Sequence, residues 1–522
     1  MLRELLAEGR NSEALAVVSK LVARNSELER RLAQMLARGR KNEGVSSAQL
    51  LLLLGALTSD SEGEGALDEA NEKLRAASGI DTPKPDEDEP QTAPKRKQPP
   101  LRRPIPAHLR RVDNPINVPD AERACPICGA ERTCIGHDVT EVIELIPAEL
   151  IVRRDLREKL ACEPCEGELV RAPIGDKVVA GGRLGSTLVA NLLVEKYRDG
   201  LQLHRQRERF ERLGLLLPVS TLADQVTWGT DLLRPLWRAA LVGALNAKVM
   251  HLDGTGLVVL DRDAPGGKKL GTLWGYIGDR DIAVVLYAST GKKVGQQPGE
   301  LGPEDVLALR SGYVVADASG LFDKSFRRDA LIECGCNMHA RRYYVKALDG
   351  GDARAALPIA AFKKLYQVEH ESRDLDDEGR RAARQERSKP VYDELCAWCE
   401  THQPHEPPSS PLGTAIRYLL NHRIALRRFL DDGVIPIDNG IVERLHVRTA
   451  LTRKNFLFAG SDAGAERAAI AYTILGGCKL ADVNPVEYLA DVLPRLMRPI
   501  RLCDVPDLLP ARWKERRTPR PE

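Results

Sequence analysis

The sequence predicts a mixed α/β protein whose central sheet carries acidic side chains. Asp253 interrupts one apolar run, Asp317 directly follows another, and Glu443 stands near the predicted start of a later helix. Two carboxylates on neighbouring strands and a third on a helix can converge on a pair of divalent metal ions, which suits phosphodiester chemistry. The apolar runs that are typical of strands, separated by Gly, Asp and basic turns, are 250–260, 272–277, 282–287 and 313–316.

Length and composition narrow the class of protein. A chain of 522 residues is too long for one core, so we expect several domains. No apolar run approaches the roughly 18–20 residues that span a bilayer, and the first residues lack a signal-peptide pattern. We therefore expect a cytoplasmic protein with no membrane partner. Its 11 cysteines should be reduced there, so that paired cysteines are metal ligands rather than disulfides.

The N-terminal region 1–57 is predicted to be helical. Leu21, Leu28 and Met35 recur every seven residues, which fits either a short coiled coil or one amphipathic helix packed on its own domain. Residues 58–120 lack aromatic side chains and are predicted to form a disordered linker. Its basic stretch, which follows an acidic block, fits both a phosphate-binding segment and a solvated linker.

Two Cys-x-x-Cys pairs in 121–180 predict a zinc-binding domain. The four thiolates would be the usual tetrahedral shell of one structural Zn²⁺. Cys134 and His137 offer an alternative second half for a more compact site with the first pair. The favoured ligands are Cys125, Cys128, Cys162 and Cys165.

The region 181–245 is predicted to be helical throughout. Helices over 186–198 and 201–213 precede a third that Ser220 or Thr221 would cap, in the manner of a helix-turn-helix. Arg205 and Arg209 make the middle helix basic, which suits DNA contact. A plain helical bundle explains the same pattern.

The catalytic region is expected over 246–480. Its middle, about 340–435, is predicted to be a helical insertion, and 481–522 a C-terminal helix with a basic tail. The pairs Cys334/Cys336 and Cys396/Cys399 lack a second half nearby, so we interpret them as buried apolar side chains. The predicted helices between Asp317 and Glu443 are 325–348, 355–372, 376–399 and 412–430.

With these motifs in order, the chain resembles the insertion-sequence-66 family of bacterial transposases, which use an Asp-Asp-Glu triad. The resemblance rests on the cysteine pairs and on further segments: Tyr197–Gln206, His251-Leu-Asp-Gly-Thr255, His339-Ala-Arg-Arg342, Arg384–Pro390, Asp438-Asn439 with Glu443-Arg444, and Arg453–Ser461. It implies an RNase H-like core in which Asp253, Asp317 and Glu443 are catalytic and bind two Mg²⁺ or Mn²⁺ ions.

The resemblance also implies partners. These are double-stranded DNA (element ends and target), further copies of the chain, and small accessory proteins of the same element, at the nucleoid of a bacterium. Phosphate contacts are expected from Arg341, Arg448, Arg453 and Lys454. In an RNase H-like sheet the first and fourth strands are neighbours, so Asp253 and Asp317 should lie about one strand spacing, roughly 4.8 Å, apart. Glu443 should come from a helix that begins at Asp438 or Asn439.

Three departures from the family pattern leave other functions open. Gly254 stands where the family usually has Glu, Ala318-Ser319 where it has Gly-Tyr, and Gly440 where it has a second Asn. Gly254 and Gly440 favour a decayed or domesticated zinc-containing DNA-binding protein, whereas the intact triad favours an enzyme. A host nuclease of the RNase H type would need neither the zinc domain nor the helical insertion.

Overall fold

The computed structural model describes part of the chain. The predicted helices of 1–57, most of the linker and the four zinc-ligand cysteines lie outside the described residues. The chain divides into two compact units, 1–83 with 155–522 and 84–154, and 150–154 is the described part of the second unit. The described residues are 65–79, 150–154, 159–160, 170–171, 184–290, 294–296, 299–317 and 320–517.

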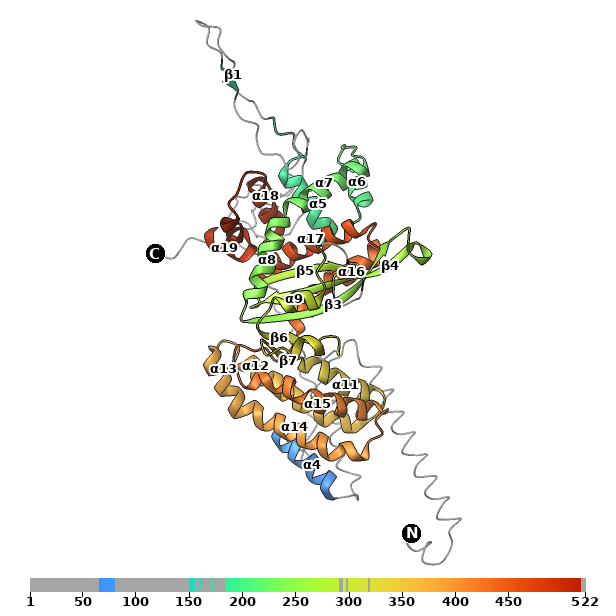
Figure 1. The fold of residues 1–522 in the computed structure, drawn as a ribbon, viewed down its shortest axis with the longest axis vertical. Helices are drawn as coiled ribbons and strands as arrows, with labels where there is room; N and C mark the ends of the chain where they lie inside the picture. The colour runs from blue at the N-terminus through green and yellow to red at the C-terminus, as the bar shows by residue number, and fades with distance from the viewer. Residues whose placement is uncertain are drawn as a thin grey trace, which may run out of the picture. The chain divides into compact units, whose positions relative to one another are not determined.

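A five-stranded mixed sheet lies at the centre of the first unit, in the order β5-β4-β3-β6-β7 (Figure 1). Strands β3, β4 and β5 form an antiparallel meander, whereas β6 is parallel to β3 and β7 is parallel to β6. Four of these strands coincide with the predicted apolar runs, so the prediction of a mixed α/β protein is confirmed. The strands are β3 (Val249–Leu260), β4 (Lys268–Gly278), β5 (Ile282–Ala288), β6 (Gly312–Ala316) and β7 (Leu331–Gly335).

The turn between β4 and β5 also fixes the start of β3. Asp279 and Arg280 adopt positive φ angles of 46° and 80°, which reverse the chain tightly. The carboxylate of Asp279 accepts hydrogen bonds from the backbone N–H groups of Lys248 and Val249, each at 3.0 Å. These two bonds therefore tie the turn between β4 and β5 to the first residues of β3.

Helices α8 (Arg234–Asn246) and α17 (Asp462–Leu480) are hydrogen-bonded to the same residue of β5. Trp237 Nε1 of α8 donates to the carbonyl oxygen of Val285 at 2.9 Å, and the N–H of Val285 donates to Thr473 Oγ1 of α17 at 2.8 Å. These side-chain bonds tie both helices to the backbone of an outer strand.

Helix α16 (Gly440–Phe456) packs directly on β4 because position 275 is a glycine. A Cβ atom at Gly275 would lie 2.6 Å from His446 Nε2 and 3.2 Å from Val442 Cγ2. The missing side chain therefore brings α16, which carries Glu443, close to the sheet.

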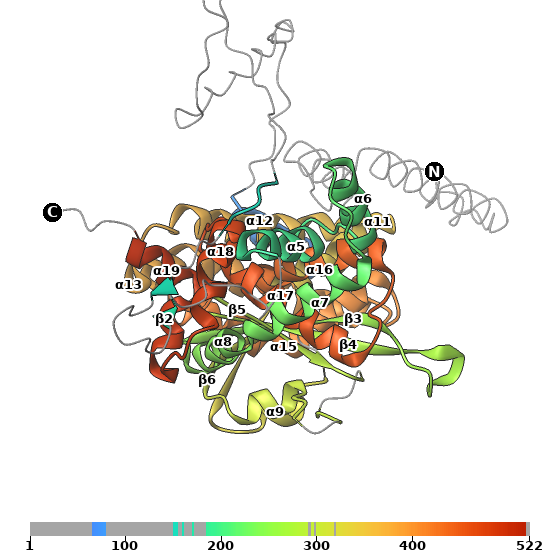
Figure 2. The ribbon, with the colours of Figure 1, turned by 90° about the horizontal axis from the view of Figure 1, so that it is seen from above.

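The region before the sheet is helical, as predicted, and contains α5 (Ser186–Tyr197), α6 (Leu203–Arg212) and α7 (Val219–Leu232). Figure 2 shows α5 and α7 close to α17, and both contact it. The prediction that Ser220 or Thr221 caps α7 is wrong. Pro218 is the N-cap residue, with the extended angles φ −61° and ψ 143°, so both hydroxyl residues fall inside the first turn.

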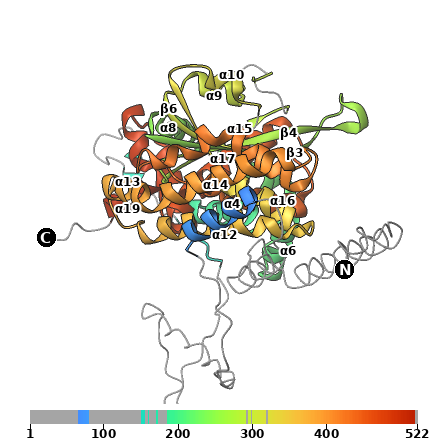
Figure 3. The ribbon, with the colours of Figure 1, turned by 90° about the horizontal axis from the view of Figure 1, so that it is seen from below.

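Most of the chain between β7 and α16 is helical. Helix α4 (Gly65–Ala77) lies within the predicted disordered linker 58–120, so the prediction of disorder is wrong for these residues. It packs against α12 and α14 of the helical segment (Figure 3), and Trp398 Nε1 donates to Asn71 Oδ1 at 2.7 Å. The core of the helical segment between β7 and α16 contains the fully buried rings of Tyr344, Phe362 and Trp398. None of the described helices is long and apolar enough to cross a membrane. The α-helices are α11 (Asn337–Asp349), α12 (Ala356–Glu371), α13 (Asp377–Ala383), α14 (Lys389–His402) and α15 (Pro411–Arg427).

The predicted single helix over 325–348 is wrong. The chain there forms α10 (Asp323–Phe326), strand β7 and then α11. Strand β7 pairs with β6 residue for residue, from Gly312 with Leu331 to Ala316 with Gly335. This pairing with a distant strand determines the conformation of a five-residue segment that has no strong preference of its own.

Candidate active site

Asp253 lies on β3, next to the helix that carries Glu443. It pairs with Gly275 across the β3–β4 ladder, and His446 Nε2 of α16 lies 3.2 Å from its backbone carbonyl oxygen. The pKa of Asp253 is raised to about 6, first by burial and then by the nearby carboxylates of Glu443 and Asp317. The two other predicted carboxylates therefore lie close enough to disfavour its charged form.

Asp317 follows β6 at the same level of the sheet as Asp253. The parallel register pairs His251 with Val315, and each aspartate comes two residues later in the chain, Asp253 within β3 and Asp317 just after β6. Burial raises the pKa of Asp317, an effect that the nearby His339 opposes. Both aspartates are therefore partly desolvated at neighbouring positions.

Glu443 lies in the first turn of α16 and faces the first turns of α11. Its Oε1 lies 3.5 Å from His339 Nε2, and its Oε2 lies 3.4 Å from Arg342 Nη2. The side chain of Glu443 is about three-quarters buried, with 24% exposed. The structure thus brings Glu443 beside two basic side chains of α11 and within electrostatic range of Asp253.

The start of α16 is joined to β3 through Asn439. Its Oδ1 lies 2.9 Å from His251 Nδ1, and its Nδ2 donates to the carbonyl oxygen of Leu252 at 2.8 Å. Burial lowers the pKa of His251 to about 4, so the ring is neutral at pH 7 and its Nδ1–H donates to the amide oxygen. Asn439 is the N-cap residue of α16 but makes no side-chain cap bond, because its amide is used on β3.

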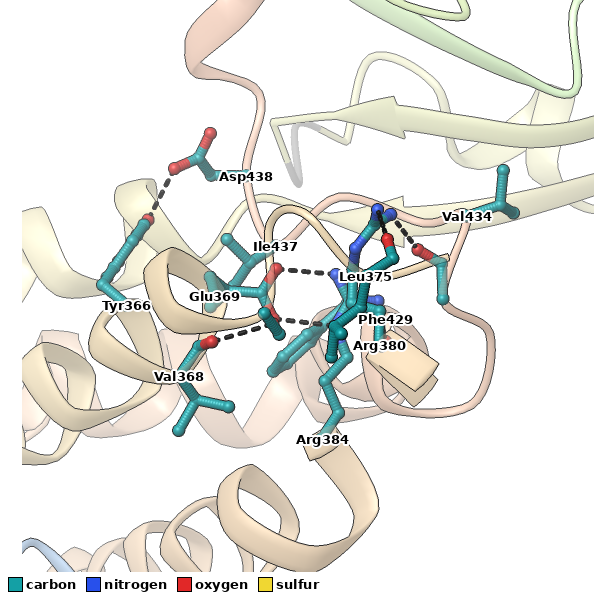
Figure 4. A network of polar contacts seen from close by, with 12 residues as sticks. Tyr366, Val368, Glu369, Leu375, Arg380, Arg384, Phe429, Val434, Ile437 and Asp438 are labelled. Carbon is teal, nitrogen blue, oxygen red and sulfur yellow. Dashed lines mark hydrogen bonds and ion pairs between the residues drawn. The ribbon is translucent and has the colours of Figure 1, made fainter. Parts of the chain in front are cut away.

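The helical segment holds the loop that leads into α16 (Figure 4). Arg384 is fully buried and donates from Nε and Nη2 to the two carboxylate oxygens of Glu369, both at 2.7 Å. Its Nη1 donates to the carbonyl oxygens of Phe429 and Asp432 at 2.7 and 2.9 Å. Further along the loop, Tyr366 Oη donates to Asp438 Oδ2 at 2.8 Å. These bonds position the chain just before Glu443.

The predicted DNA-contact residues occupy different environments. Arg205, Arg448 and Lys454 are exposed, and Arg341 is half-buried. Arg209 pairs with Glu195 of α5. Arg453 donates to Thr255 Oγ1 at 3.0 Å and to the carbonyl oxygen of Gly256 at 2.5 Å. Arg209 and Arg453 thus also hold their helices in place, whereas the exposed residues present their charges to solvent.

Arg453 also lines a cavity of about 320 Å³ next to the second half of β3. Its walls include the rings of Tyr197, Phe456 and Tyr472. Lys196 Nζ lies 4.5 Å from the ring centre of Phe456, and burial lowers the pKa of this lysine. None of the three acidic residues Asp253, Asp317 and Glu443 lines the cavity, so it is separate from the carboxylate cluster.

Sequence reasoning missed two residues beside Glu443 and Asp253. Cys336, at the N-cap position of α11, is fully buried, and its Sγ accepts the N–H of Asn439 at 3.2 Å. His446, one turn after Glu443, contacts β3, and burial lowers its pKa to about 4. The spacing of His446 from Glu443 on one helix was a weak signal, whereas the contact of Cys336 depends on tertiary packing alone.

Comparison with known proteins shows the family to which this chain belongs. The family model described as "Transposase IS66 family" matches residues 181–467, more than half of the chain. The chain therefore belongs to the IS66 family of transposases. A second model, the zinc-finger binding domain of transposase IS66, matches residues 122–166, which contain the four predicted zinc-ligand cysteines.

Relatives that match most of this chain are found in Sinorhizobium fredii (strain NBRC 101917 / NGR234). The uncharacterized protein y4hP is 31% identical over 442 residues, which cover 80% of this chain and 77% of that protein. The uncharacterized protein y4jD is 32% identical over 424 residues, covering 78% and 81%. The uncharacterized protein y4qI is 29% identical over 525 residues, covering 97% and 94%. The relatives thus share most of the length of this chain.

Proposed function

We propose that this chain is a DNA transposase that cuts double-stranded DNA at the ends of its insertion element and joins those ends to target DNA. The proposal places it in the bacterial cytoplasm, at the nucleoid, as a homo-oligomer. It leaves a role for small accessory proteins of the same element. Membership of the IS66 transposase family supports the reaction class.

The observation that carries the proposal is the convergence of three carboxyl groups: Asp253 on β3 and Asp317 after β6 lie at neighbouring positions of the sheet, and Glu443 of α16 lies within electrostatic range of Asp253. Carboxylates that are buried together favour a bound cation, which relieves their mutual repulsion. Hard oxygen donors suit Mg²⁺ or Mn²⁺, so the three side chains fit the metal site that the family implies. A pair of such ions would supply activation of the attacking oxygen and neutralisation of charge on the phosphate.

The remaining residues in the proposal orient this site and bind DNA. His251, Asn439 and His446 hold α16 against β3, so that Glu443 stays beside Asp253. Exposed basic side chains neutralise phosphates and confer salt-sensitive binding. The proposed DNA-contact residues are Arg205, Arg209, Arg341, Arg448, Arg453 and Lys454.

An RNase H-like core is supported by the strand order and directions. The first three strands form an antiparallel meander, and the fourth and fifth add in parallel beside the first. The proposed catalytic domain is 246–480 with its helical insertion at about 340–435, after helical 1–57, linker 58–120, zinc domain 121–180 and helical 181–245. The match to the zinc-finger model supports one structural Zn²⁺ on Cys125, Cys128, Cys162 and Cys165.

A decayed or domesticated DNA-binding protein is the second candidate, and Gly254 favours it. A Cβ atom at Gly254 would lie 2.5 Å from Cζ3 of Trp274, its cross-strand partner on β4. The indole thus occupies space beside Asp253 that the Glu side chain usual in the family would need. This packing changes the surroundings of the first aspartate without removing its carboxylate.

Strand cleavage distinguishes the two candidates. The purified protein is incubated with a labelled duplex that carries one end of its element, with Mg²⁺ or Mn²⁺, and products are separated on a denaturing gel. A transposase yields a nick at the element end and joined products, and Asp317→Asn abolishes both while DNA binding persists. If the wild type binds the duplex but leaves it intact with either ion, the binding protein is the correct assignment.

A further inference from the structure

Three side chains with different donor atoms meet where α11 and α16 begin. The Sγ of Cys336, a ring nitrogen of His339 and a carboxylate oxygen of Glu443 all lie within 4.8 Å of one another. Cys336 and His339 are three residues apart in the first turn of α11, and Glu443 comes from the first turn of α16. Two helix starts thus direct a sulfur, a nitrogen and an oxygen donor toward one point.

Two buried polar atoms of these side chains lack hydrogen-bond partners in the part of the chain that the structure describes. Nδ1 of His339 and Oε1 of Glu443 are buried, and neither has a hydrogen-bond partner among the described residues. Leaving a buried polar atom without a partner is unfavourable. A bound ion would give Oε1 of Glu443 a partner.

The sulfur of Cys336 is buried and accepts backbone hydrogen bonds. The backbone N–H groups of Asn439 and His339 both point at Sγ of Cys336, the first at 3.2 Å. Asn439 is itself fixed by His251 and Leu252, so this donor is held in place. Hydrogen bonds to a ligating sulfur are typical of the outer shell of a metal site.

We propose that Cys336, His339 and Glu443 bind one thiophilic divalent ion of the zinc class, at a site distinct from the zinc-finger domain. A sulfur, a nitrogen and an oxygen ligand with an open fourth position suit Zn²⁺ or Co²⁺ and do not suit Mg²⁺. Tetrahedral coordination needs roughly 3.5 Å between sulfur and nitrogen ligands. Rotations of three side chains that reduce their separations by about 1 Å would close the site.

The site has one consequence for the reaction, which rests on the proposed function. Glu443 is shared between this cluster and the oxygen-ligand site that Asp253 and Asp317 complete. An ion held by Cys336 and His339 would take Glu443 away from that site, so zinc should inhibit Mg²⁺-dependent strand cleavage. Binding of the ion itself requires neither DNA nor catalysis.

The test is a Co²⁺ titration of the full-length protein, whose zinc-finger domain is first filled with Zn²⁺. Thiolate coordination of Co²⁺ gives a near-ultraviolet charge-transfer band, and tetrahedral geometry gives strong visible bands. We expect one further equivalent in the wild type, with at least about tenfold weaker binding in Cys336→Ser and in His339→Ala. The partly exposed His339 provides a variant that folds if Cys336→Ser does not.

Cys334→Ser is the matched control. Cys334 is also buried, lies two residues earlier on β7 and has its Sγ near the carbonyl oxygen of Ile332 rather than in the cluster. Equal Co²⁺ spectra for the wild type, Cys336→Ser and His339→Ala would overturn the site. Inhibition is measured separately, by comparing the DNA cleavage rate of each protein with and without added Zn²⁺. A protein that binds the extra Co²⁺ but cuts no DNA would contradict the proposed function and leave the metal site standing.

Discussion

His251 Nδ1 lies 2.9 Å from Oδ1 of Asn439, and this bond joins segments that are 188 residues apart in the chain. The same amide donates to the backbone of Leu252, one residue before Asp253. Asn439 therefore fixes the distance between the strand that carries Asp253 and the helix that carries Glu443.

Asn439→Ala should lower both stability and cleavage. It leaves the ring nitrogen of His251 and the carbonyl oxygen of Leu252 buried without this partner, at a cost of about 1–3 kcal/mol for each group. Urea unfolding measures the loss. Asn455→Ala on the same helix is the control, because Asn455 is exposed and its side chain donates to the carbonyl oxygen of Gly200. Equal stability of the two variants would show that the Asn439 contacts contribute little.

Asp253 should make the metal-free protein less stable as pH rises. Its folded-state pKa is about 6, above the unfolded value of about 3.9. Between these values the folded protein binds more protons than the unfolded chain, so its free energy of unfolding falls with pH.

Asp253→Asn should therefore be more stable than the wild type by about 1–3 kcal/mol at about pH 7.5, and by less at about pH 4.5. Urea unfolding in a chelating buffer at both pH values checks this. Saturating Mg²⁺ should reduce the advantage at the higher pH, because the ion stabilises the charged carboxylate. A difference that does not change with pH would mean that the Asp253 carboxyl is not perturbed.

The contact between Gly254 and Trp274 predicts an energetic coupling. A Cβ atom at Gly254 would meet three carbon atoms of the indole at 2.5, 2.8 and 3.1 Å, so Gly254→Ala should cost about 1–3 kcal/mol. In a Trp274→Ala background the same change should cost less, with a coupling of about 0.5–3 kcal/mol in a double-mutant cycle.

Gly256→Ala, two residues along the same strand, is the control for this cycle. Its nearest contact would be the flexible end of Leu270, at 3.3 Å. Additive effects of Gly254→Ala and Trp274→Ala would contradict the steric account of this departure from the family.

The buried Arg384–Glu369 pair should stabilise the loop before α16. Arg384→Met leaves the carboxylate of Glu369 without its main partner and should cost about 3–5 kcal/mol, measured by urea unfolding. Arg381→Met is the matched control, because Arg381 pairs with Glu378 on the surface and should change stability little. Similar losses in the two variants would argue against a special role for the buried pair.

The sequence predicts the elements whose preferences agree with their surroundings. The runs that became β3, β4, β5 and β6 are apolar, rich in strand-forming residues and bounded by turns, so the central sheet is largely predictable. Strand β7 is not, because Leu331–Gly335 becomes a strand through its pairing with β6. Likewise, the start of α7 depends on the extended conformation of Pro218 rather than on the nearby hydroxyl residues.

In the candidate site, too, some features follow from local sequence patterns and others only from tertiary contacts. The apolar runs around Asp253 and before Asp317 predict that both residues belong to the sheet, and the parallel register of β3 and β6 places them at neighbouring positions. Cys336 was interpreted as an apolar side chain, and it is buried, but no sequence pattern places its sulfur beside Glu443. Contacts between segments a hundred residues apart arise only from the folded arrangement.

The central claim is that Asp253, Asp317 and Glu443 act together in metal-dependent DNA cleavage. Its most direct test is the cleavage rate of Glu443→Gln on an element-end duplex in Mg²⁺, beside Glu487→Gln, an exposed change on α18 (Pro485–Leu496). We predict that Glu443→Gln cuts at least about 100-fold more slowly, in the range typical for loss of a general catalytic group, with unchanged DNA binding and an unchanged zinc content of the zinc-finger domain, while Glu487→Gln cuts like the wild type. Cleavage by Glu443→Gln at the wild-type rate would contradict the account.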